Sequence, residues 1–224
     1  MMSITERFIP YDPPTITDPN VIRKTQEFYF NLKTRRSIRE FSSKPVPREV
    51  IENILKAAGT APSGANKQPW TFCVISNQEL KNRIRKSAEE EEFISYHGRM
   101  SEEWMKDLEP FGTNHIKEFI EVCPYIIAVF KKAYDVDENG NRHSNYYVNE
   151  SVGIAVGFLL LAIHNAGLVS LTHTPSPMNF LHEILGRPEN ERPYLLIPVG
   201  YPKDNIKVPN ITRKPIEDIA VFYD

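Results

Sequence analysis

The sequence has little cysteine and almost no excess of charge of either sign. Its 224 residues include only two cysteines, Cys73 and Cys123, which lie far apart and outside any CxxC pattern. This excludes a disulfide-stapled miniprotein, gives no sign of a cysteine metal site and favours a reducing, cytoplasmic setting. The 27 lysines and arginines nearly balance the 29 aspartates and glutamates, for a formal net charge of −2. We therefore expect no nucleic-acid partner.

The sequence also lacks a secretory signal and a long uninterrupted apolar run. Residues 1–20 contain neither the basic nor the apolar region of a signal peptide, and we expect them to form an ordered or half-ordered arm. The most apolar stretch covers residues 152–163 and ends at His164 and Asn165. At about 1.5 Å per helical residue it is shorter than the roughly 30 Å core of a bilayer. We interpret it as a buried central helix and expect no membrane segment.

Familiar catalytic and metal-binding motifs are absent as well. The chain contains no GxGxxG after a strand, no GxxxxGK[ST], no HExxH and no GxSxG. Its six histidines show no pairing with carboxylates at zinc spacing, so we expect no metal site. The function must be inferred from less common patterns.

What the chain does contain is a regular succession of helical and extended patterns. No repeat, low-complexity tract or linker divides it, so we expect a single domain over residues 1–224. Pro47 is predicted at the first position of a helix and Asn77 as the N-cap of the next one. Long helices between isolated strands indicate an α+β or α/β fold. Predicted helices cover residues 21–32, 50–58, 77–96, 152–165 and 179–185, with shorter pieces near Trp104 and Phe119; predicted strands cover residues 70–75, 125–130, 168–172 and 195–199.

Two glycines lie four residues apart on the predicted central helix. Gly153 and Gly157 would let another backbone approach closely. This pattern suits packing within the chain and a helix at a dimer interface about equally.

The segment from residue 34 to 41 is rich in groups that bind anions. Arg35, Arg36 and Arg39 surround the hydroxyl of Ser37, and guanidinium forks with a hydroxyl suit a phosphate better than a single carboxylate. Arg213 near the carboxyl terminus could close the same site. The segment taken alone is also compatible with an ordinary solvated basic stretch.

Residues 62–70 form the most unusual segment of the chain. Small residues between Pro62 and Pro69 leave backbone N–H groups uncovered and allow a planar ligand to approach. An ordinary loop would also account for this segment in isolation.

The order RRSIREF, PREVIENILKAAGTAPSGANKQPWTF, PVGYP and RKP resembles the FMN-dependent nitroreductase superfamily over residues 34–215. The segments EFISY, TNHIK and THTP are similar to its iodotyrosine deiodinase branch, in a soluble, bacterial-type form. The resemblance implies a nitroreductase-like fold, with a mostly antiparallel central sheet surrounded by helices, in an intertwined homodimer that binds FMN at the subunit interface.

The resemblance also implies where the cofactor binds. Arg35, Arg36, Ser37 and Arg213 would hold the phosphate. The remaining cofactor residues implied by it are Arg39, Pro62, Ser63, Gly64, Thr172, His173 and Thr174. In this branch a hydroxyl at the place of Thr174 hydrogen-bonds flavin N5 and permits stepwise one-electron transfer. Without the resemblance Thr174 would be interpreted as an ordinary threonine at a strand end, and His173 stands where a smaller hydroxyl residue is expected.

The substrate site follows from the same resemblance. Glu92, Tyr96 and Lys117 would engage the amino-acid part of the substrate, and the backbone N–H of Ala65 its phenolate oxygen, beneath a lid around residues 89–117. Glu92 and Tyr96 are four apart and share a face if the segment is helical. A carboxylate, a phenol and an ammonium match a zwitterion. Without the resemblance, Glu92 in its four-glutamate run and Lys117 would be interpreted as surface residues.

We therefore expect a homodimeric FMN enzyme that removes halide reductively from 3-halotyrosines, with electrons from NAD(P)H or a separate reductase. Free halophenols remain potential substrates. A broad NAD(P)H-dependent nitro or quinone reductase is the alternative, in which Glu92, Tyr96 and Lys117 would be incidental. A third hypothesis is a flavin- or small-molecule-binding protein without turnover.

Overall fold

The structure, a computed structural model, describes residues 9–11 and 18–224. The chain divides into two compact units, Met1–Arg35 and Arg36–Asp224. In the first unit, α1 (Asp18–Lys33) confirms the helix predicted over residues 21–32. Most of the predicted amino-terminal arm lies outside the described residues.

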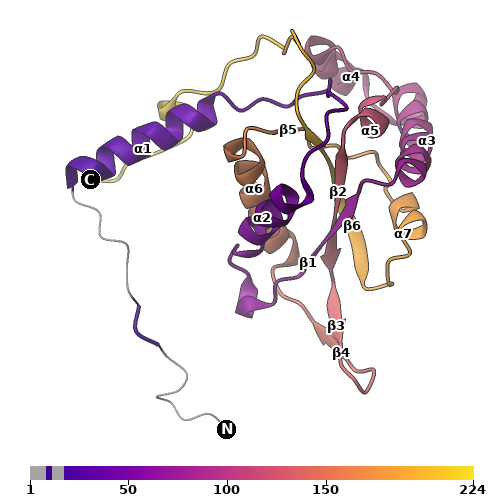
Figure 1. Ribbon diagram of the computed structural model, residues 1–224, viewed down its shortest axis with the longest axis horizontal. Helices are drawn as coiled ribbons and strands as arrows, with labels where there is room; N and C mark the ends of the chain where they lie inside the picture. The colour runs from indigo at the N-terminus through magenta and orange to yellow at the C-terminus, as the bar shows by residue number, and fades with distance from the viewer. Residues whose placement is uncertain (1–8, 12–17) are drawn as a thin grey trace. The chain divides into compact units, whose positions relative to one another are not determined.

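A four-stranded antiparallel sheet forms the centre of the second unit, in the order β1-β2-β6-β5 (Figure 1). Trp70 lies opposite Lys131, and Tyr125 opposite Val199. All four predicted strands are present, two of them longer than predicted and one shorter. The strands are β1 (Trp70–Ile75), β2 (Tyr125–Lys132), β5 (Val169–Ser170) and β6 (Glu191–Gly200).

A small hairpin, not predicted from the sequence, surrounds the turn at residues 137–141. Its strands are β3 (Tyr134–Val136) and β4 (Arg142–Ser144). Asp137 organises the turn by accepting the backbone N–H groups of Asn139 and Asn141, at 2.9 and 2.8 Å. Both strands are short and partly exposed, so they carry no apolar alternation that would reveal them.

Helices cover both faces of the central sheet (Figure 1). On one face α2 and α6 pack against Ile127 and Val129 of β2. On the other face α3, α5 and α7 pack against Ile126, Ala128 and Phe130 of the same strand. Because alternate residues of β2 enter two different cores, the strand is apolar along its whole buried length.

The helices of the second unit agree with the predicted ones, with some shifts at their ends. Pro47 is the N-cap of α2 rather than its first residue. The Asn77 side chain caps α3 as predicted and accepts the Leu80 N–H at 2.9 Å. The short helical piece predicted near Phe119 is α5. The elements are α2 (Arg48–Gly59), η2 (Gly64–Asn66), α3 (Gln78–Ile94), the π-helix η3 (Ser95–Arg99), α4 (Glu102–Leu108), η4 (Glu109–Phe111), α5 (Phe119–Val122), α6 (Val148–Asn165), α7 (Phe180–Ile184) and η5 (Ile216–Asp218).

Helix α6 is long and apolar enough to cross a membrane by length and composition, a test that core helices of soluble proteins also pass. Val152, Leu159 and Ile163 are buried in one core. Ile154 and Phe158 are 43% and 38% exposed. The predicted burial of this helix is therefore confirmed on one face, while the other face is apolar and open in the single chain.

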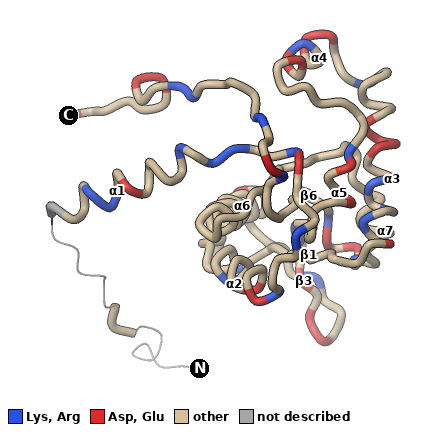
Figure 2. The backbone as a smooth tube through the Cα atoms, turned by 45° about the horizontal axis from the view of Figure 1, so that its top comes forward, with Lys and Arg blue, Asp and Glu red and all other residues tan. Residues whose placement is uncertain are grey.

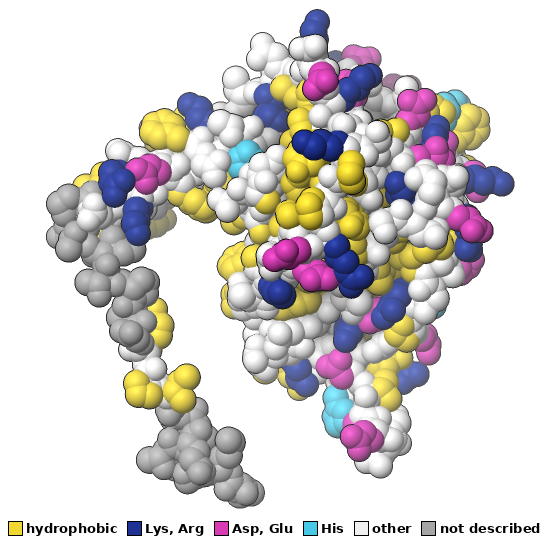
Figure 3. Space-filling model, viewed as in Figure 1, with side chains coloured by type: hydrophobic (Ala, Val, Ile, Leu, Met, Phe, Trp, Pro, Cys, Tyr) yellow, Lys and Arg dark blue, Asp and Glu magenta, His cyan; other side chains and the backbone are white. Residues whose placement is uncertain are grey.

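Charge is spread in small groups over the second unit. Helix α3 carries both signs, with its lysines and arginines before a run of four glutamates (Figure 2). On the face seen in Figure 3, basic and acidic side chains are scattered among apolar ones. This face therefore offers no extended patch of one sign for a polyanion.

Candidate active site

The structure brings together the three residues predicted to engage an amino acid. Glu92 lies in the last turn of α3, and Tyr96 in the π-helix η3 that continues it. Lys117 immediately precedes the turn into α5. The Lys117 Nζ lies 3.3 Å from Glu92 Oε2 and 5.8 Å from the centre of the Tyr96 ring. Segments 21 residues apart in the sequence thus form one polar cluster.

Glu92 and Lys117 form a largely buried ion pair. Their side chains are only 12% and 5% exposed. Burial raises the pKa of Glu92 and lowers the pKa of Lys117, while the charge of each residue opposes the shift of the other. The Lys117 ammonium also donates to Asn114 O and, at 3.4 Å, to Thr113 Oγ1. Neither residue is the surface residue that the sequence alone suggests.

Tyr96 connects this pair to Arg39. Burial raises the pKa of Tyr96, whereas a hydrogen bond with Thr113 and the nearby charge of Arg39 act in the opposite direction. Arg39 lines a cavity of about 220 Å³ together with Ser37, Phe111 and Gly112. Its guanidinium lies 5.8 Å from the centre of the Phe111 ring.

Arg39 has the properties of an anion-binding group. Its side chain is half-buried, and burial lowers the pKa of Arg39. No salt bridge within residues 36–224 gives it a carboxylate partner. A partly desolvated guanidinium without a counterion favours an anionic ligand.

The segment around Arg39 is held by the edge of the sheet. Ser37 pairs with Ser170 of β5, and the Ile38 N–H donates to Ser170 O at 3.0 Å. The buried Ile38 side chain anchors the segment. Arg36 and Ser37 are half-buried beside it, and the Arg36 guanidinium donates to Pro209 O. Of the two other predicted phosphate ligands, Arg35 ends the first compact unit and Arg213 is exposed in the carboxyl-terminal segment.

Thr172, His173 and Thr174 point in alternate directions. His173 pairs with Leu196 through two backbone hydrogen bonds of 2.9 Å, which fix an extended conformation. Thr172 and Thr174 are exposed, whereas His173 is buried. The two hydroxyls are therefore available on one side of the segment. The His173 side chain points to the opposite side, into the protein.

The His173 ring lies next to the ion pair of Glu92 and Lys117. Its ring meets the Phe119 ring edge-on with centroids 5.4 Å apart, and its Nδ1 is 3.9 Å from Glu92 Oε1, too far for a hydrogen bond. Burial lowers the pKa of His173 to about 3, with Lys117 and Arg39 adding to the effect. The imidazole is therefore neutral, and its buried Nε2 lacks a hydrogen-bond partner in the described part of the chain.

The loop from Pro62 to Gln68 is more constrained than the sequence suggests. Ala65, Asn66 and Gln68 all have positive φ, at 49°, 52° and 47°. Such backbone in non-glycine residues costs about 1–3 kcal/mol each and clusters at functional sites. Ser63 Oγ braces the loop by accepting the Gln68 N–H at 2.9 Å. Pro62 and Ala65 are exposed, so this strained turn is accessible from solvent.

Gly64 also lies close to another part of the chain. A Cβ atom there would lie 3.0 Å from the Tyr147 ring and 3.2 Å from Tyr146 O. The missing side chain therefore makes room for Tyr146 and Tyr147, directly before α6.

Sequence reasoning missed three residues that complete the cluster. Thr113 and Asn114 hold the Lys117 ammonium, and Glu89 Oε1 accepts the Lys117 backbone N–H at 2.7 Å. The spacing of Glu89 and Glu92, three apart on a helix, was the signal that would have placed both on one face.

Comparisons with known proteins identify the family of the chain. Residues 32–201 match the nitroreductase family. The chain is 58% identical to the iodotyrosine deiodinase of Haliscomenobacter hydrossis over 216 residues, which cover 96% of this chain and 97% of that protein. It is 44% identical to iodotyrosine deiodinase 1 of Homo sapiens, over 95% of this chain and 74% of that protein.

Among solved structures, an oxidised iodotyrosine deiodinase bound to FMN and 3-iodo-L-tyrosine superimposes with a TM-score of 0.75. The match covers 88% of this chain and 98% of that one, at 31% sequence identity. The two chains therefore share one fold.

Proposed function

The chain belongs to the nitroreductase family, and we propose that it is a flavin-dependent oxidoreductase of the iodotyrosine deiodinase type. It replaces the carbon–halogen bond of a 3-halotyrosine by a carbon–hydrogen bond, consuming two electrons and one proton and releasing tyrosine and halide. The observation that carries this proposal is the buried pair of Glu92 and Lys117 beside Tyr96.

The residues present suit FMN. Arg36, Ser37 and Arg39 offer the donors that a phosphate and a polar ring edge require. Arg39 has no salt bridge within residues 36–224. Arg35 and Arg213 are proposed to add to the phosphate site, and the loop of Pro62, Ser63 and Gly64 to line the flavin. The exposed hydroxyls of Thr172 and Thr174 are proposed to face the cofactor, with Thr174 on flavin N5. When bound, FMN supplies the electrons of the reaction.

The ion pair supports recognition of an amino-acid zwitterion. Glu92 and Lys117 neutralise one another across 3.3 Å, and a substrate ammonium and carboxylate can each take the place of one partner. The exchange keeps every buried charge paired, which lowers the cost of desolvating the zwitterion. Tyr96 flanks the pair and provides a hydroxyl. A free halophenol lacks these charges and gains nothing from the pair.

The far end of the substrate is proposed to meet the strained loop. The backbone N–H of Ala65 is the proposed donor to the phenolate oxygen, and the positive φ of Ala65 and Asn66 supports a turn shaped for a ligand. Hydrogen bonding to an oxyanion favours the ionised phenol. The protein thus orients the ring from both ends while the cofactor supplies the electrons.

Residues 89–117 are proposed to act as a lid. Phe111 and Gly112 line the Arg39 cavity, and Thr113, Asn114 and Lys117 contribute polar contacts. The segment that covers the cavity therefore also carries Lys117, which is proposed to bind the substrate. Closing this segment would exclude water and complete the site at the same time.

The assembly and setting are also proposals. The apolar open face of α6, with Ile154, Gly157 and Phe158, supports a homodimer with the flavin at its interface. Electrons are proposed to come from NAD(P)H or from a separate reductase. The two unpaired cysteines and the near-neutral charge support a cytoplasmic protein without membrane or nucleic-acid partners.

An anaerobic single turnover tests the proposed activity. The FMN-loaded protein is reduced with dithionite and mixed with 3-iodotyrosine, and flavin reoxidation is followed with tyrosine and iodide formation. We expect one tyrosine and one iodide for each flavin reoxidised. Flavin that stays reduced with 3-iodotyrosine yet reoxidises with a nitroaromatic would instead indicate a general nitroreductase.

A further inference from the structure

Glu89 links Arg85 of α3 to the backbone of Lys117, the residue proposed to bind the substrate. One of its oxygens, Oε1, accepts the Lys117 backbone N–H at 2.7 Å and the Arg85 Nε–H at 2.7 Å. Glu89 is only 21% exposed at its side chain, and Arg85 is 23% exposed. Both contacts involve charged groups in a partly desolvated place, where hydrogen bonds are strongest.

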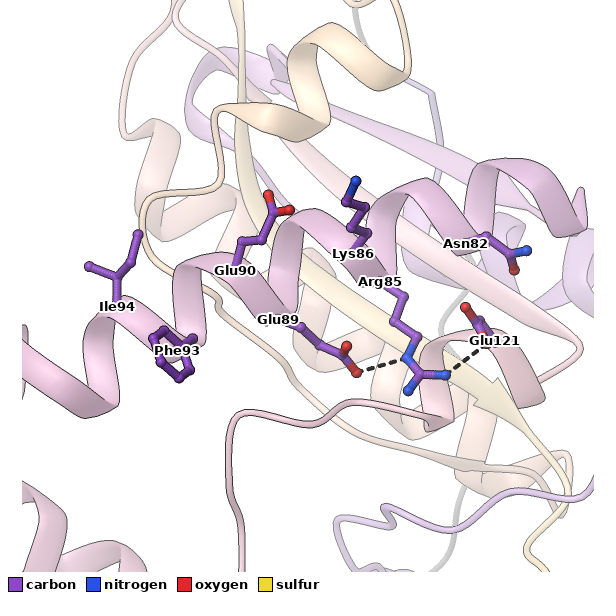
Figure 4. A pocket seen from close by; sticks show the side chains of 8 residues that line it. All are labelled: Asn82, Arg85, Lys86, Glu89, Glu90, Phe93, Ile94 and Glu121. Atoms are coloured by element: carbon purple, nitrogen blue, oxygen red, sulfur yellow. Dashed lines mark hydrogen bonds and ion pairs between the residues drawn. The ribbon is translucent and has the colours of Figure 1, made fainter.

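Arg85 extends this link to α5. Its NH1 group lies 2.8 Å from Glu121 Oε2, so the guanidinium bridges Glu89 on α3 and Glu121 on α5 (Figure 4). These ion pairs raise the pKa of Arg85. Helix α3 therefore holds the chain at Lys117 and again four residues later at Glu121.

Glu89 and Glu92 divide the contacts of Lys117 between them. They lie three residues apart on α3, so their side chains share one face. Glu89 takes the backbone N–H of Lys117, and Glu92 takes its ammonium at 3.3 Å. The contact with Glu89 fixes the position of the Lys117 backbone, and the ion pair with Glu92 fixes the position of its ammonium.

The same polar contacts are not needed to hold α3 against α5. Ile84 and Ala88 of α3 and Ile120 of α5 are fully buried in one apolar core. The hydrophobic packing therefore sets the distance between the helices, while the polar contacts of Glu89 act on the backbone just outside α5. A cavity of about 560 Å³ opens beside Arg85 and Glu89, on the side lined also by Phe93 and Ile94.

We propose that Glu89, braced by Arg85, is a positioning residue that holds the Lys117 backbone so that its ammonium meets the amino-acid part of the substrate. Glu89 does not touch substrate; it acts through Lys117 and so contributes to the preference for halotyrosines over halophenols. This inference rests on the proposed function.

The test compares E89A with E90A. Glu90 is the next residue on α3, is exposed and has no ion pair or hydrogen bond within the described chain, so E90A removes the same charge without the link. We expect E89A to raise the KM for 3-iodotyrosine about tenfold or more, the cost of one charge-assisted hydrogen bond, with a much smaller change in kcat. E90A should behave as the unmodified enzyme. E89Q, which keeps an acceptor oxygen for the Lys117 N–H, should restore most of the loss.

A second measurement does not depend on turnover. Amide hydrogen exchange of the FMN-bound protein without substrate should become faster over residues 113–118 in E89A and remain unchanged in E90A. Equal exchange and equal KM in the two variants would overturn the proposal, as would an E89A defect confined to kcat. If the unmodified enzyme releases no iodide, the proposed function is wrong, and the exchange comparison still decides whether Glu89 holds Lys117.

Discussion

The ammonium of Lys117 lies 3.3 Å from the carboxylate of Glu92, and both side chains are almost completely withdrawn from water. Burying two charged side chains costs free energy unless each is paired with the other or with a charged ligand. The pair lies at the end of α3, next to Tyr96 and the neutral imidazole of His173. The fold is shared with an iodotyrosine deiodinase structure bound to 3-iodo-L-tyrosine. We interpret the pair as a zwitterion receptor that is neutralised internally until substrate arrives.

Replacing Lys117 should affect binding more than chemistry. We expect K117Q to raise the KM for 3-iodotyrosine about thirtyfold or more, because losing one partner of a desolvated charge pair costs about 2–5 kcal/mol. The maximal rate should change far less. Steady-state kinetics measure both, with K86Q as the control, since Lys86 is exposed on α3. Equal losses in kcat and kcat/KM would show that Lys117 is not a binding residue.

Thr174 should matter to electron transfer. We expect T174A to lose the radical signal of singly reduced flavin during stepwise reduction, and to release iodide about tenfold more slowly, roughly the value of one hydrogen bond to a developing charge. Electron paramagnetic resonance and iodide release measure the two effects. The control is S176A, which removes a hydroxyl from the same exposed segment. A full radical signal in T174A would exclude Thr174 from the mechanism.

His173 should make the protein less stable in acid. The pKa of His173 is about 3 in the folded protein and about 6.5 in the unfolded chain. Between pH 3 and pH 6.5, only the unfolded chain therefore binds a proton at this imidazole. The free energy of unfolding should therefore fall by about 1.4 kcal/mol for each pH unit between about 6.5 and about 3. Urea unfolding of H173N should show a correspondingly flatter dependence. An unchanged slope would mean that other groups control acid stability.

The open face of α6 should be a subunit interface. We expect I154E to weaken self-association at least about a hundredfold, because burying an unpaired charge costs several kcal/mol. Sedimentation analysis measures the effect, and V136E on the exposed hairpin serves as the control. If I154E dimerises with unchanged affinity, this face is not the interface, and Gly153 and Gly157 serve packing within the chain.

Much of the fold could be predicted because its signals are local. The Asn77 cap, the helical stripe of α2 and the apolar run of β2 follow from neighbouring residues alone, and the structure confirms them. The polar hairpin was missed because β3 and β4 are short and have no buried face. The extent of α6 burial also needed the structure, since an apolar helix can face a core or a partner.

The site was less accessible to sequence reasoning. Glu90 in the four-glutamate run is exposed, whereas Glu89 and Glu92 turn inward, and only the packing of α3 decides which residues do so. His173 likewise faces inward because its backbone pairs with Leu196, a residue 23 positions later. Such roles depend on contacts between distant segments, which no local pattern contains.

The most direct test of the zwitterion receptor is a comparison of two ligands on the oxidised, FMN-bound protein. Titrations followed by flavin fluorescence give the Kd of 3-iodotyrosine and of 2-iodophenol, which has the same ring chemistry without the amino-acid part. Two charge-assisted contacts of about 1.5–3 kcal/mol each predict that 3-iodotyrosine binds at least about a hundredfold more tightly. Equal affinity for the two ligands would contradict the role assigned to Glu92 and Lys117.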